Sequence, residues 1–364
     1  MERVYNFSAG QSMIPVEVLK RLESEMFSYN GSGSSFMEMS ASSPEFLEIM
    51  NSAEASLRKL MSIPSNYKVL FLQGGATTQF SAIPLNLLSQ HKCADYVLSG
   101  RFSEKAMKEA KKYGDIVVAA SSAGANPSYS TVPEIVKSDF RPDTDYVHIC
   151  FNNTVYGTRF PRIPETGNIP LVADLSSCIL SEPIDVSKFG LIYASSQMNI
   201  APAGLTVVIV REDLIGNARP DTPAMLNYKI LAEEGSRYNT PPCHSIYIAK
   251  LVFDWILEIG GLEEMKRRNE RKASLLYDLI DGQSYFVSPV DKKCRSMMNV
   301  VFHTGSTELD NRFMREAERI GLKNLAGDEK IGGMRASIYN AMPVEGVETL
   351  VAFMRKFANE NPKI

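Results

Sequence analysis

Between about residue 45 and residue 210, short β-rich runs alternate with helical segments, and this alternation restricts the fold more than any other feature of the chain. The runs that read as strands are YKVLFLQ, ADYVLSG, DIVVAAS, DYVHICF, IPLVADLS, GLIYASS and LTVVIVR. The helical segments are SPEFLEIMNSAEASLRKLMSI, TTQFSAIPLNLLSQ and FSEKAMKEAKKYG. The first of them opens at Ser43, with Glu45 nearby, so we expect Ser43 to cap that helix. Strands that alternate with helices are typical of a parallel sheet covered by helices, and the sequence therefore predicts an α/β fold.

The chain changes character near residue 260. A long helical segment, LEEMKRRNERKASLLYDLID, is followed by a shorter mixed tail that ends in VEGVETLVAFMRKFANE. This pattern indicates a second, smaller α/β domain of about 100 residues.

Composition excludes several classes of protein. The chain has 364 residues, a formal charge of -3 and 44% hydrophobic residues, which suits two domains with sizeable cores. It carries no block of like charges and no basic stripe, so a nucleic-acid partner is not expected. No apolar run reaches the roughly 20 residues of a membrane span, and the start MERVYNFSAG lacks the features of a signal peptide. We therefore expect no membrane partner and a cytoplasmic location.

The cysteines and histidines show no disulfide or metal-binding pattern. The five cysteines are odd in number, scattered and never in C-x-x-C spacing, and the four histidines are equally dispersed. We expect reduced thiols and no metal site. These residues are Cys93, Cys150, Cys178, Cys243, Cys294, His91, His148, His244 and His303.

Five loops that follow strands carry the chemical information, because ligands of open α/β sheets bind at the carboxyl ends of the strands. In the first, Ala76 and Thr77 follow two glycines between a strand and a helix; the helix N-terminus could hold an anion, or the glycines could serve the turn alone. Phe102 could stack on a planar ligand or pack in the core, and Thr154 ends another strand. Asp174 ends a fully apolar strand, where a carboxylate costs several kcal/mol unless a cation or hydrogen-bond donors meet it.

The fifth loop is ASSQMNIAPAG, between two strand-like runs. One planar cofactor, pyridoxal phosphate, accounts for all five loops: the glycine turn would meet its phosphate, the aromatic ring its ring face, and the carboxylate its pyridinium nitrogen. The group that this interpretation still requires is a lysine.

The chain resembles the phosphoserine aminotransferases, class V members of the fold-type I pyridoxal phosphate enzymes. The resemblance rests on NFSAG, LQGGATTQF, NNTVYGTRF, ADLSS, PAGLTVVIVREDLIG, YNTPP and GGMRASIYNAMPVEGVE, which follow one another in the order of that family and run nearly end to end. It implies a large cofactor-binding domain over residues 16–259, with a mostly parallel seven-stranded sheet. It also implies a small α/β domain over residues 260–364, joined by residues 1–15. The family is homodimeric, with active sites at the subunit interface, and converts 3-phosphohydroxypyruvate and glutamate into phosphoserine and 2-oxoglutarate.

The resemblance also implies roles for individual residues. Asp174 would meet the pyridine nitrogen, Thr154 the ring hydroxyl, and Phe102 would stack on the ring in place of the usual tryptophan. The cofactor phosphate would be held by Ala76, Thr77 and Gln197, with Asn239 and Thr240 reaching it from the partner subunit. Arg335 corresponds to the arginine that binds the substrate carboxylate.

The decisive departure from the family lies in the fifth loop. The family reads A-Q-K-N-I-G-P-A-G where this chain reads SQMNIAPAG, so Met198 stands at the position of the Schiff-base lysine and Ala201 at that of a glycine. Methionine has no amine, so it can neither bond to the cofactor nor shuttle the α-proton. General acid–base assistance alone is worth about 10²–10⁴-fold in rate, and we expect ordinary transamination to be nearly abolished.

Other departures fall on the substrate site. The family's SHRS reads SASS here, which puts Ala41 and Ser42 at cationic positions. The family's GHR, which contributes to the same anion site across the dimer, reads GDEK here, with Asp328 and Glu329. Each charge-assisted hydrogen bond to an anion is worth about 1.5–3 kcal/mol, so we expect phosphoserine affinity to be lost. Smaller departures are Gln11, Arg101 and Cys178.

Four hypotheses follow, beside simple decay of an aminotransferase or an inactivated form of it. The first is a repurposed member that binds pyridoxal or pyridoxamine phosphate non-covalently and takes an amino or keto acid without phosphate. The second is another reaction that uses Asp328 or Glu329 as base, with or without a cofactor. The third is a non-catalytic subunit that pairs with an intact aminotransferase. The fourth is that another lysine, for example Lys330, replaces the missing one.

Overall fold

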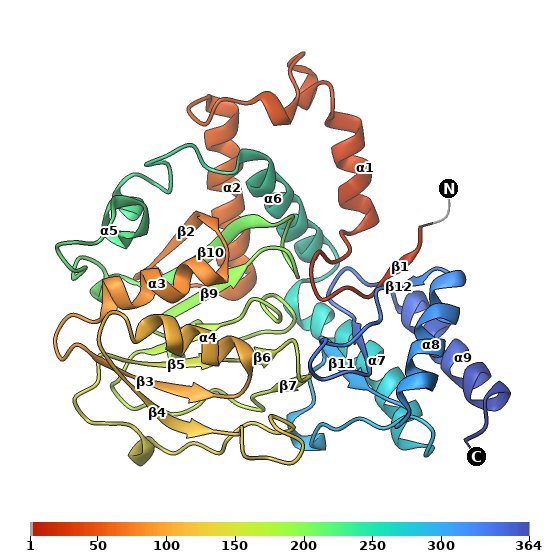
Figure 1. The fold of residues 1–364 in the computed structure, drawn as a ribbon. Coiled ribbons are helices and arrows are strands. Elements are labelled where there is room, and N and C mark those ends of the chain that lie inside the picture. Colours follow the sequence, from red (N-terminus) through yellow and green to blue (C-terminus); the bar gives the residue numbers. More distant parts are fainter. Residues whose placement is uncertain (1–2, 364) are drawn as a thin grey trace.

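The main sheet of the protein has seven strands. The structure is a computed structural model, and it describes residues 3–363. The sheet has the order β2-β10-β9-β8-β5-β3-β4 (Figure 1). Its strands are β2 (Tyr67–Gly74), β3 (Cys93–Leu98), β4 (Asp115–Ser121), β5 (Tyr146–Cys150), β8 (Leu171–Asp174), β9 (Leu191–Ser195) and β10 (Gly204–Arg211). Strand β10 runs antiparallel to both of its neighbours, and the other pairs are parallel. The predicted α/β fold with a mostly parallel seven-stranded sheet is confirmed.

The central strands are buried on both faces, which explains why they read as continuous apolar runs rather than as alternating ones. Every residue of β3, β5, β8 and β9 is buried. On one face lie α3 (Ala76–Leu87), α4 (Arg101–Ala110) and α5 (Tyr228–Glu233). On the other lie α2 (Pro44–Met61) and α6 (Cys243–Glu258), with α1 (Val16–Glu25) against α6 (Figure 1).

Helix α2 begins where the sequence predicts. The side chain of Ser43 accepts a hydrogen bond from the Phe46 N–H at 3.2 Å, and Glu45 lies in the first turn. The helix buries seven apolar side chains against the sheet and α6. The expected cap at Ser43 is confirmed.

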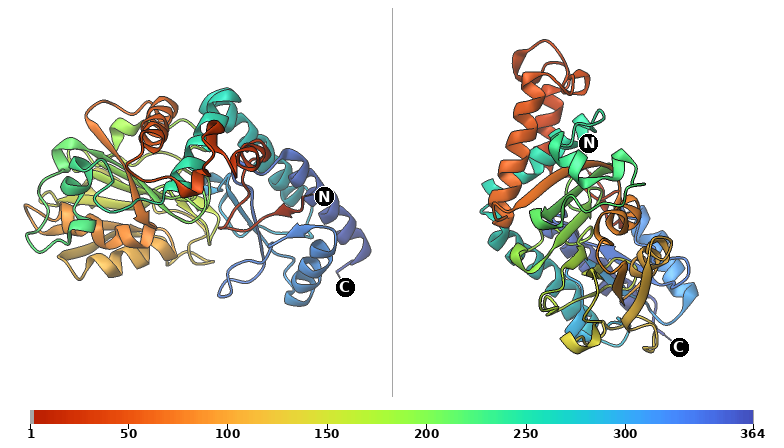
Figure 2. Two further views of the ribbon diagram at one scale, coloured as in Figure 1. Left: turned by 90° about the horizontal axis from the view of Figure 1, so that it is seen from above. Right: turned by 90° about the vertical axis from the view of Figure 1, so that its left-hand side faces the viewer.

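The C-terminal part of the chain has its own hydrophobic core. Its elements are α7 (Gly261–Asp281), β11 (Asn299–Phe302), α8 (Thr307–Arg319), β12 (Leu322–Lys323), β13 (Met334–Ser337) and α9 (Val344–Glu360). Strand β11 pairs with β13, and β12 pairs with the N-terminal strand β1 (Tyr5–Asn6). Phe7 is fully buried in this second core, and both ends of the described chain lie on this side of the molecule (Figure 2). A short hairpin of β6 (Asn152–Asn153) and β7 (Thr158–Arg159) follows β5.

A buried polar network joins this C-terminal part to the fifth loop. Lys272 in α7 is 2% exposed, and its ammonium group donates to the carbonyls of Ile338, Tyr339 and Met342 at 2.7–3.1 Å. Within the segment so held, the Asn340 N–H donates to the side chain of Asn199 at 3.0 Å. Because Asn199 follows Met198, the loop is fixed from the C-terminal side as well as from the sheet.

The buried histidine of β5 leads to a pH-dependent prediction of stability. His148 is 1% exposed, stacks on Tyr96 with ring centroids 4.6 Å apart, and places Nε2 2.9 Å from the Tyr193 hydroxyl. Burial lowers the pKa of His148 to about 3, from the ordinary value of 6.5 that the unfolded chain retains. Between these values the unfolded state binds more protons, so the stability contributed by neutral His148 is lost as the pH falls below about 6.5. From this residue we expect the free energy of unfolding to be about 2 kcal/mol lower at pH 5 than at pH 7.

Urea unfolding at several pH values measures this effect. The control is a His148→Phe variant, which keeps a ring beside Tyr96 but cannot titrate. Its stability should fall less between pH 7 and pH 5 than that of the unmodified protein. Equal losses in the two proteins would contradict the prediction.

No helix within residues 3–363 is long and apolar enough to cross a membrane, and the same residues contain no group of three or more side chains suited to hold a metal ion.

Candidate functional site

The strand ends that the sequence analysis singles out meet at one edge of the main sheet. Asp174 at the end of β8 lies opposite Cys150 of β5 and Tyr193 of β9. Gly204 at the start of β10 lies opposite Gly74 at the end of β2. The β9–β10 loop therefore leaves the sheet where the glycine turn and the buried carboxylate do.

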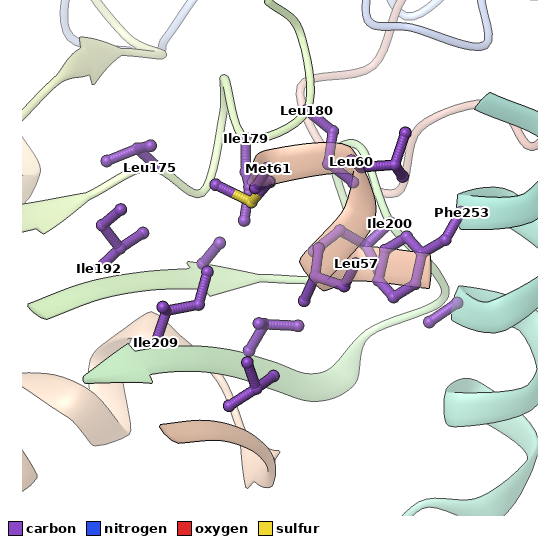
Figure 3. Close-up of a cluster of buried hydrophobic side chains, with 14 of the residues drawn as sticks. Leu57, Leu60, Met61, Leu175, Ile179, Leu180, Ile192, Ile200, Ile209 and Phe253 are labelled. Atoms are coloured by element: carbon purple, nitrogen blue, oxygen red, sulfur yellow. The ribbon is translucent and has the colours of Figure 1, made fainter. Parts of the chain in front are cut away.

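The β9–β10 loop is anchored in the core below it. The N–H groups of Ile200 and Ala201 both donate to the Ser196 carbonyl, at 3.0 and 2.9 Å, and the side chains of both residues are buried. Figure 3 shows Ile200 among the apolar side chains of this core, together with Leu175 and Ile179, which follow Asp174 in sequence. The residues around Met198 are thus held firmly, while Met198 itself is half-buried.

The N-terminal segment binds the other side of the loop. The Ser12 hydroxyl donates to the Met198 carbonyl, and the Ser12 N–H donates to the Gln197 carbonyl at 3.0 Å. The side-chain oxygen of Gln11 accepts from the Ala203 N–H at 3.2 Å. This contact gives Gln11, one of the departures from the family, a structural role that sequence reasoning missed.

Asp174 is a buried carboxylate without a cationic partner. It is 5% exposed, and it accepts a hydrogen bond from the Ser176 N–H at 2.9 Å. Within the described residues no lysine or arginine pairs with it, and burial is the main cause that raises its pKa. The Tyr193 hydroxyl, which also contacts His148, lies beside it. A cationic ring nitrogen placed here would supply the charge that this carboxylate lacks.

The glycine turn and the loop meet through Ser195. Helix α3 begins at Ala76 after Gly75, which provides no side-chain cap, so the first N–H groups of the helix are free to bind an anion. A Cβ atom added to Gly75 would lie 3.3 Å from the Ser195 hydroxyl, and that hydroxyl donates to the side chain of Gln197 at 2.5 Å. Through Ser195, Gln197 therefore lies close to the glycine turn that precedes Ala76 and Thr77.

Phe102 and Thr154 lie on the adjacent segments. Phe102 is half-buried in the first turn of α4, with the Lys105 ammonium group 5.7 Å from its ring centroid. Thr154 is 5% exposed. The two segments are in contact, because a Cβ atom added to Gly100 would lie 2.7 Å from the side chain of Asn153.

Arg335 enters the site from β13 of the C-terminal part. Its Nη1 donates to the Thr154 carbonyl at 3.4 Å, a long contact, and its buried Nε has no partner within residues 3–363. Burial lowers the pKa of this guanidinium from its ordinary value. A carboxylate would satisfy both the charge and the free donor.

Two departures from the family contact each other. The Arg101 guanidinium, in the first turn of α4, lies 2.7 Å from the Asp328 carboxylate. The resemblance assigns Asp328 to an anion site across the dimer, whereas the structure pairs it with an arginine of the same chain. Glu329 next to it is exposed.

The remaining expected residues lie at the margins. Asn239 and Thr240 are exposed and contact Gln73 at the end of β2: the Asn239 side-chain amide donates to Gln73 at 3.4 Å, and Gln73 donates to the Thr240 carbonyl. Ala41 packs on the core, and the Ser42 hydroxyl lies 2.9 Å from that of Ser40. Neither of these two hydrogen-bonds to the strand-end residues described above.

The residues present fit pyridoxal phosphate. Two features test the fit, and they lie at the same edge of the sheet. The buried carboxylate of Asp174 lacks a cationic partner, and the N-terminus of α3 at Ala76 has no side-chain cap. Met198 has no amine, so its side chain cannot form a Schiff base with the cofactor.

Comparisons with known proteins agree with this geometry. The Aminotransferase class-V model matches residues 4–350. A phosphoserine aminotransferase of Bacillus cereus is 52% identical over 99% of this chain and 100% of its own length. The solved phosphoserine aminotransferase of Bacillus circulans subsp. alkalophilus superposes with a TM-score of 0.95, at 45% identity over 99% of each chain. Another solved phosphoserine aminotransferase, studied for radiation damage of its Schiff base, has the same TM-score at 42% identity, over 99% of this chain and 100% of that one. The chain therefore belongs to the class V aminotransferase family and is a relative of its phosphoserine aminotransferases.

Proposed function

We propose that this protein is a phosphoserine aminotransferase relative that binds pyridoxal or pyridoxamine phosphate without a covalent bond, takes an amino or keto acid that carries no phosphate, and does not perform ordinary transamination. The observation that carries the proposal is Met198, held at the lysine position beside a cofactor-binding edge that is otherwise kept. Asp174 keeps its buried carboxylate, and α3 keeps its open N-terminus.

Each side chain has a definite task in this proposal. Asp174 holds the positive charge of the ring nitrogen in a place that water does not reach, and Phe102 covers the ring. The N–H groups of Ala76 and Thr77, with Gln197, hold the phosphate. When bound, the cofactor withdraws electron density from the ligand through its ring.

The ligand side is formed by other residues. The Thr154 hydroxyl would donate a hydrogen bond to the ring oxygen of the cofactor, and Arg335 would bind the ligand carboxylate. The Met198 thioether carries no proton to transfer, so the α-carbon of a bound amino acid faces no base at this position.

Two alternatives are less well supported by the geometry. A base at Asp328 would have to leave Arg101, with which it forms a 2.7 Å ion pair, and Glu329 is exposed. Lys330 is exposed as well, and no described contact brings it to the cofactor residues, so it is a poor replacement for the lysine.

We also propose a homodimer, in which Asn239 and Thr240 reach the cofactor phosphate of the partner. Each subunit would have a large domain over residues 16–259 and a small domain over residues 260–364 with residues 1–15. Phe27 is 88% exposed and Met37 61% exposed in the turn between α1 and α2, which projects from the body (Figure 1). Exposed apolar side chains gathered in one segment are typical of a protein contact. Copurification with an intact aminotransferase from the native cell would favour a mixed dimer instead.

Equilibrium dialysis against pyridoxal phosphate, with absorbance spectra of the bound fraction, tests the proposed function. We expect saturable binding and no covalent adduct after borohydride reduction and peptide mapping. Absence of binding at tens of micromolar would refute the proposal, and a cofactor fixed to Lys330 or another lysine would establish the alternative.

A further inference from the structure

The Arg101–Asp328 ion pair joins two segments that are far apart in sequence. The two residues are 227 positions apart, and Nη1 lies 2.7 Å from Oδ2. Asp328 belongs to the segment between β12 and β13, and Arg101 precedes Phe102 at the start of α4. The Asp328 side chain is 14% exposed. Its Oδ1 accepts a hydrogen bond from the Lys330 N–H at 3.1 Å, so Arg101 is its cationic partner but not its only donor.

The surroundings of the pair carry charges of both signs. Arg335 lies close enough for the Asp328 carboxylate to act on its pKa, and Asp328 therefore stands near two guanidinium groups. The Tyr156 hydroxyl lies near both members of the pair, and burial is the main cause that raises its pKa. Glu104 is also near, and it accepts a hydrogen bond from the Tyr129 hydroxyl.

The two arginines differ in what they can offer a ligand. The Nε of Arg335 has no partner, so this guanidinium can accept an anionic group without losing a contact. Arg101 already holds a carboxylate of its own chain. An anionic group of a ligand that approached Arg101 would find its charge already paired and would face the repulsion of the Asp328 carboxylate.

We infer that Asp328 is an internal anion that occupies Arg101 and thereby determines specificity: the site takes ligands with one carboxylate, bound to Arg335, and a neutral group at the other end. This inference rests on the proposed function, because it concerns the ligand of the same site. A neutral polar end, such as a hydroxyl group, leaves the ion pair intact. A phosphate end meets the repulsion of the Asp328 carboxylate, and it is rejected.

The test compares two probes, L-serine and O-phospho-L-serine, by calorimetric titration of the full-length protein with and without pyridoxal phosphate. An Asp328→Asn variant removes the negative charge that is paired with Arg101 and that repels an anionic ligand. We expect its affinity for phosphoserine, relative to serine, to rise about tenfold or more. The matched control is Glu329→Gln, which removes one negative charge from the adjacent position but touches no arginine in the described residues. We expect Glu329→Gln to change the ratio of phosphoserine to serine affinity by less than about twofold.

The outcomes separate this inference from the proposed function. An equal rise of the relative phosphoserine affinity in Asp328→Asn and Glu329→Gln would show that net charge, and not the ion pair, controls specificity. Absence of any rise in Asp328→Asn would also overturn the inference. In the double variant Arg101→Gln/Asp328→Asn, the relative affinity for phosphoserine should return to that of the unmodified protein. If Asp328→Asn does not fold, Asp328→Ser provides the same comparison. Failure of cofactor binding would refute only the proposed function. The ratio of the affinities for phosphoserine and serine can still be measured without cofactor, so the inference about Asp328 would still be tested.

Discussion

A Met198→Lys variant is expected to form a covalent bond with pyridoxal phosphate, whereas the unmodified protein forms none. The loop that carries residue 198 is already held by Ser12, Asn199 and the buried side chain of Ile200, so the new amine would be presented by an ordered backbone. Borohydride reduction followed by peptide mapping should locate the cofactor on residue 198. Proton removal from a bound amino acid should be about 10²–10⁴-fold faster in this variant than in the unmodified protein. The loss of cofactor absorbance in a single turnover measures this rate.

The control for this variant is Met198→Leu, which changes the side chain without adding an amine. Turnover of phosphoserine should stay low even in Met198→Lys, because Asp328 still occupies Arg101. A Met198→Lys protein that binds the cofactor but remains free of covalent adduct would show that the loop does not present residue 198 to the cofactor.

An Asp174→Asn variant is expected to bind the cofactor about 10–100-fold more weakly, because a charge-assisted hydrogen bond to the ring nitrogen is worth about 1.5–3 kcal/mol. The same change should stabilise the protein without cofactor. Burial raises the pKa of Asp174, so the native state binds more protons than the unfolded state above the ordinary carboxylate pKa. Stability is therefore lost as the pH rises through that range, and Asp174→Asn removes this loss at neutral pH.

Dialysis and urea unfolding at pH 7 measure the two halves of this prediction. Asp213→Asn is a suitable control, because Asp213 is an exposed carboxylate paired with Arg211 on the surface. A parallel loss of cofactor affinity and of stability in Asp174→Asn would mean that Asp174 serves the fold and not the cofactor.

The sequence was sufficient to predict the main sheet, because its strands are short apolar runs separated by helices and loops. All seven predicted runs appear in it. The helix α1 was not predicted: it buries Val18 and Leu22 and depends on packing against α6, which local sequence does not reveal.

The candidate site was predictable in its strand-end residues and less so in the contacts between distant segments. Asp174 attracted attention because a carboxylate is unusual at the end of an apolar strand. The role of Tyr193 could not be found, since a tyrosine in a buried strand reads as core. The pairing of Arg101 with Asp328 could not be found either, because no periodicity links residues that meet only after the chain has folded.

The contacts of the N-terminal segment also bear on how the protein matures during synthesis. Ser12 and Gln11 bind the loop around Met198, and β1 just before them pairs with β12, whose residues are among the last to be made. The main sheet can form while the ribosome is still translating, since its strands end at Arg211. Strand β1 must wait for Leu322, so the loop at Met198 reaches its final support only when the chain is nearly complete.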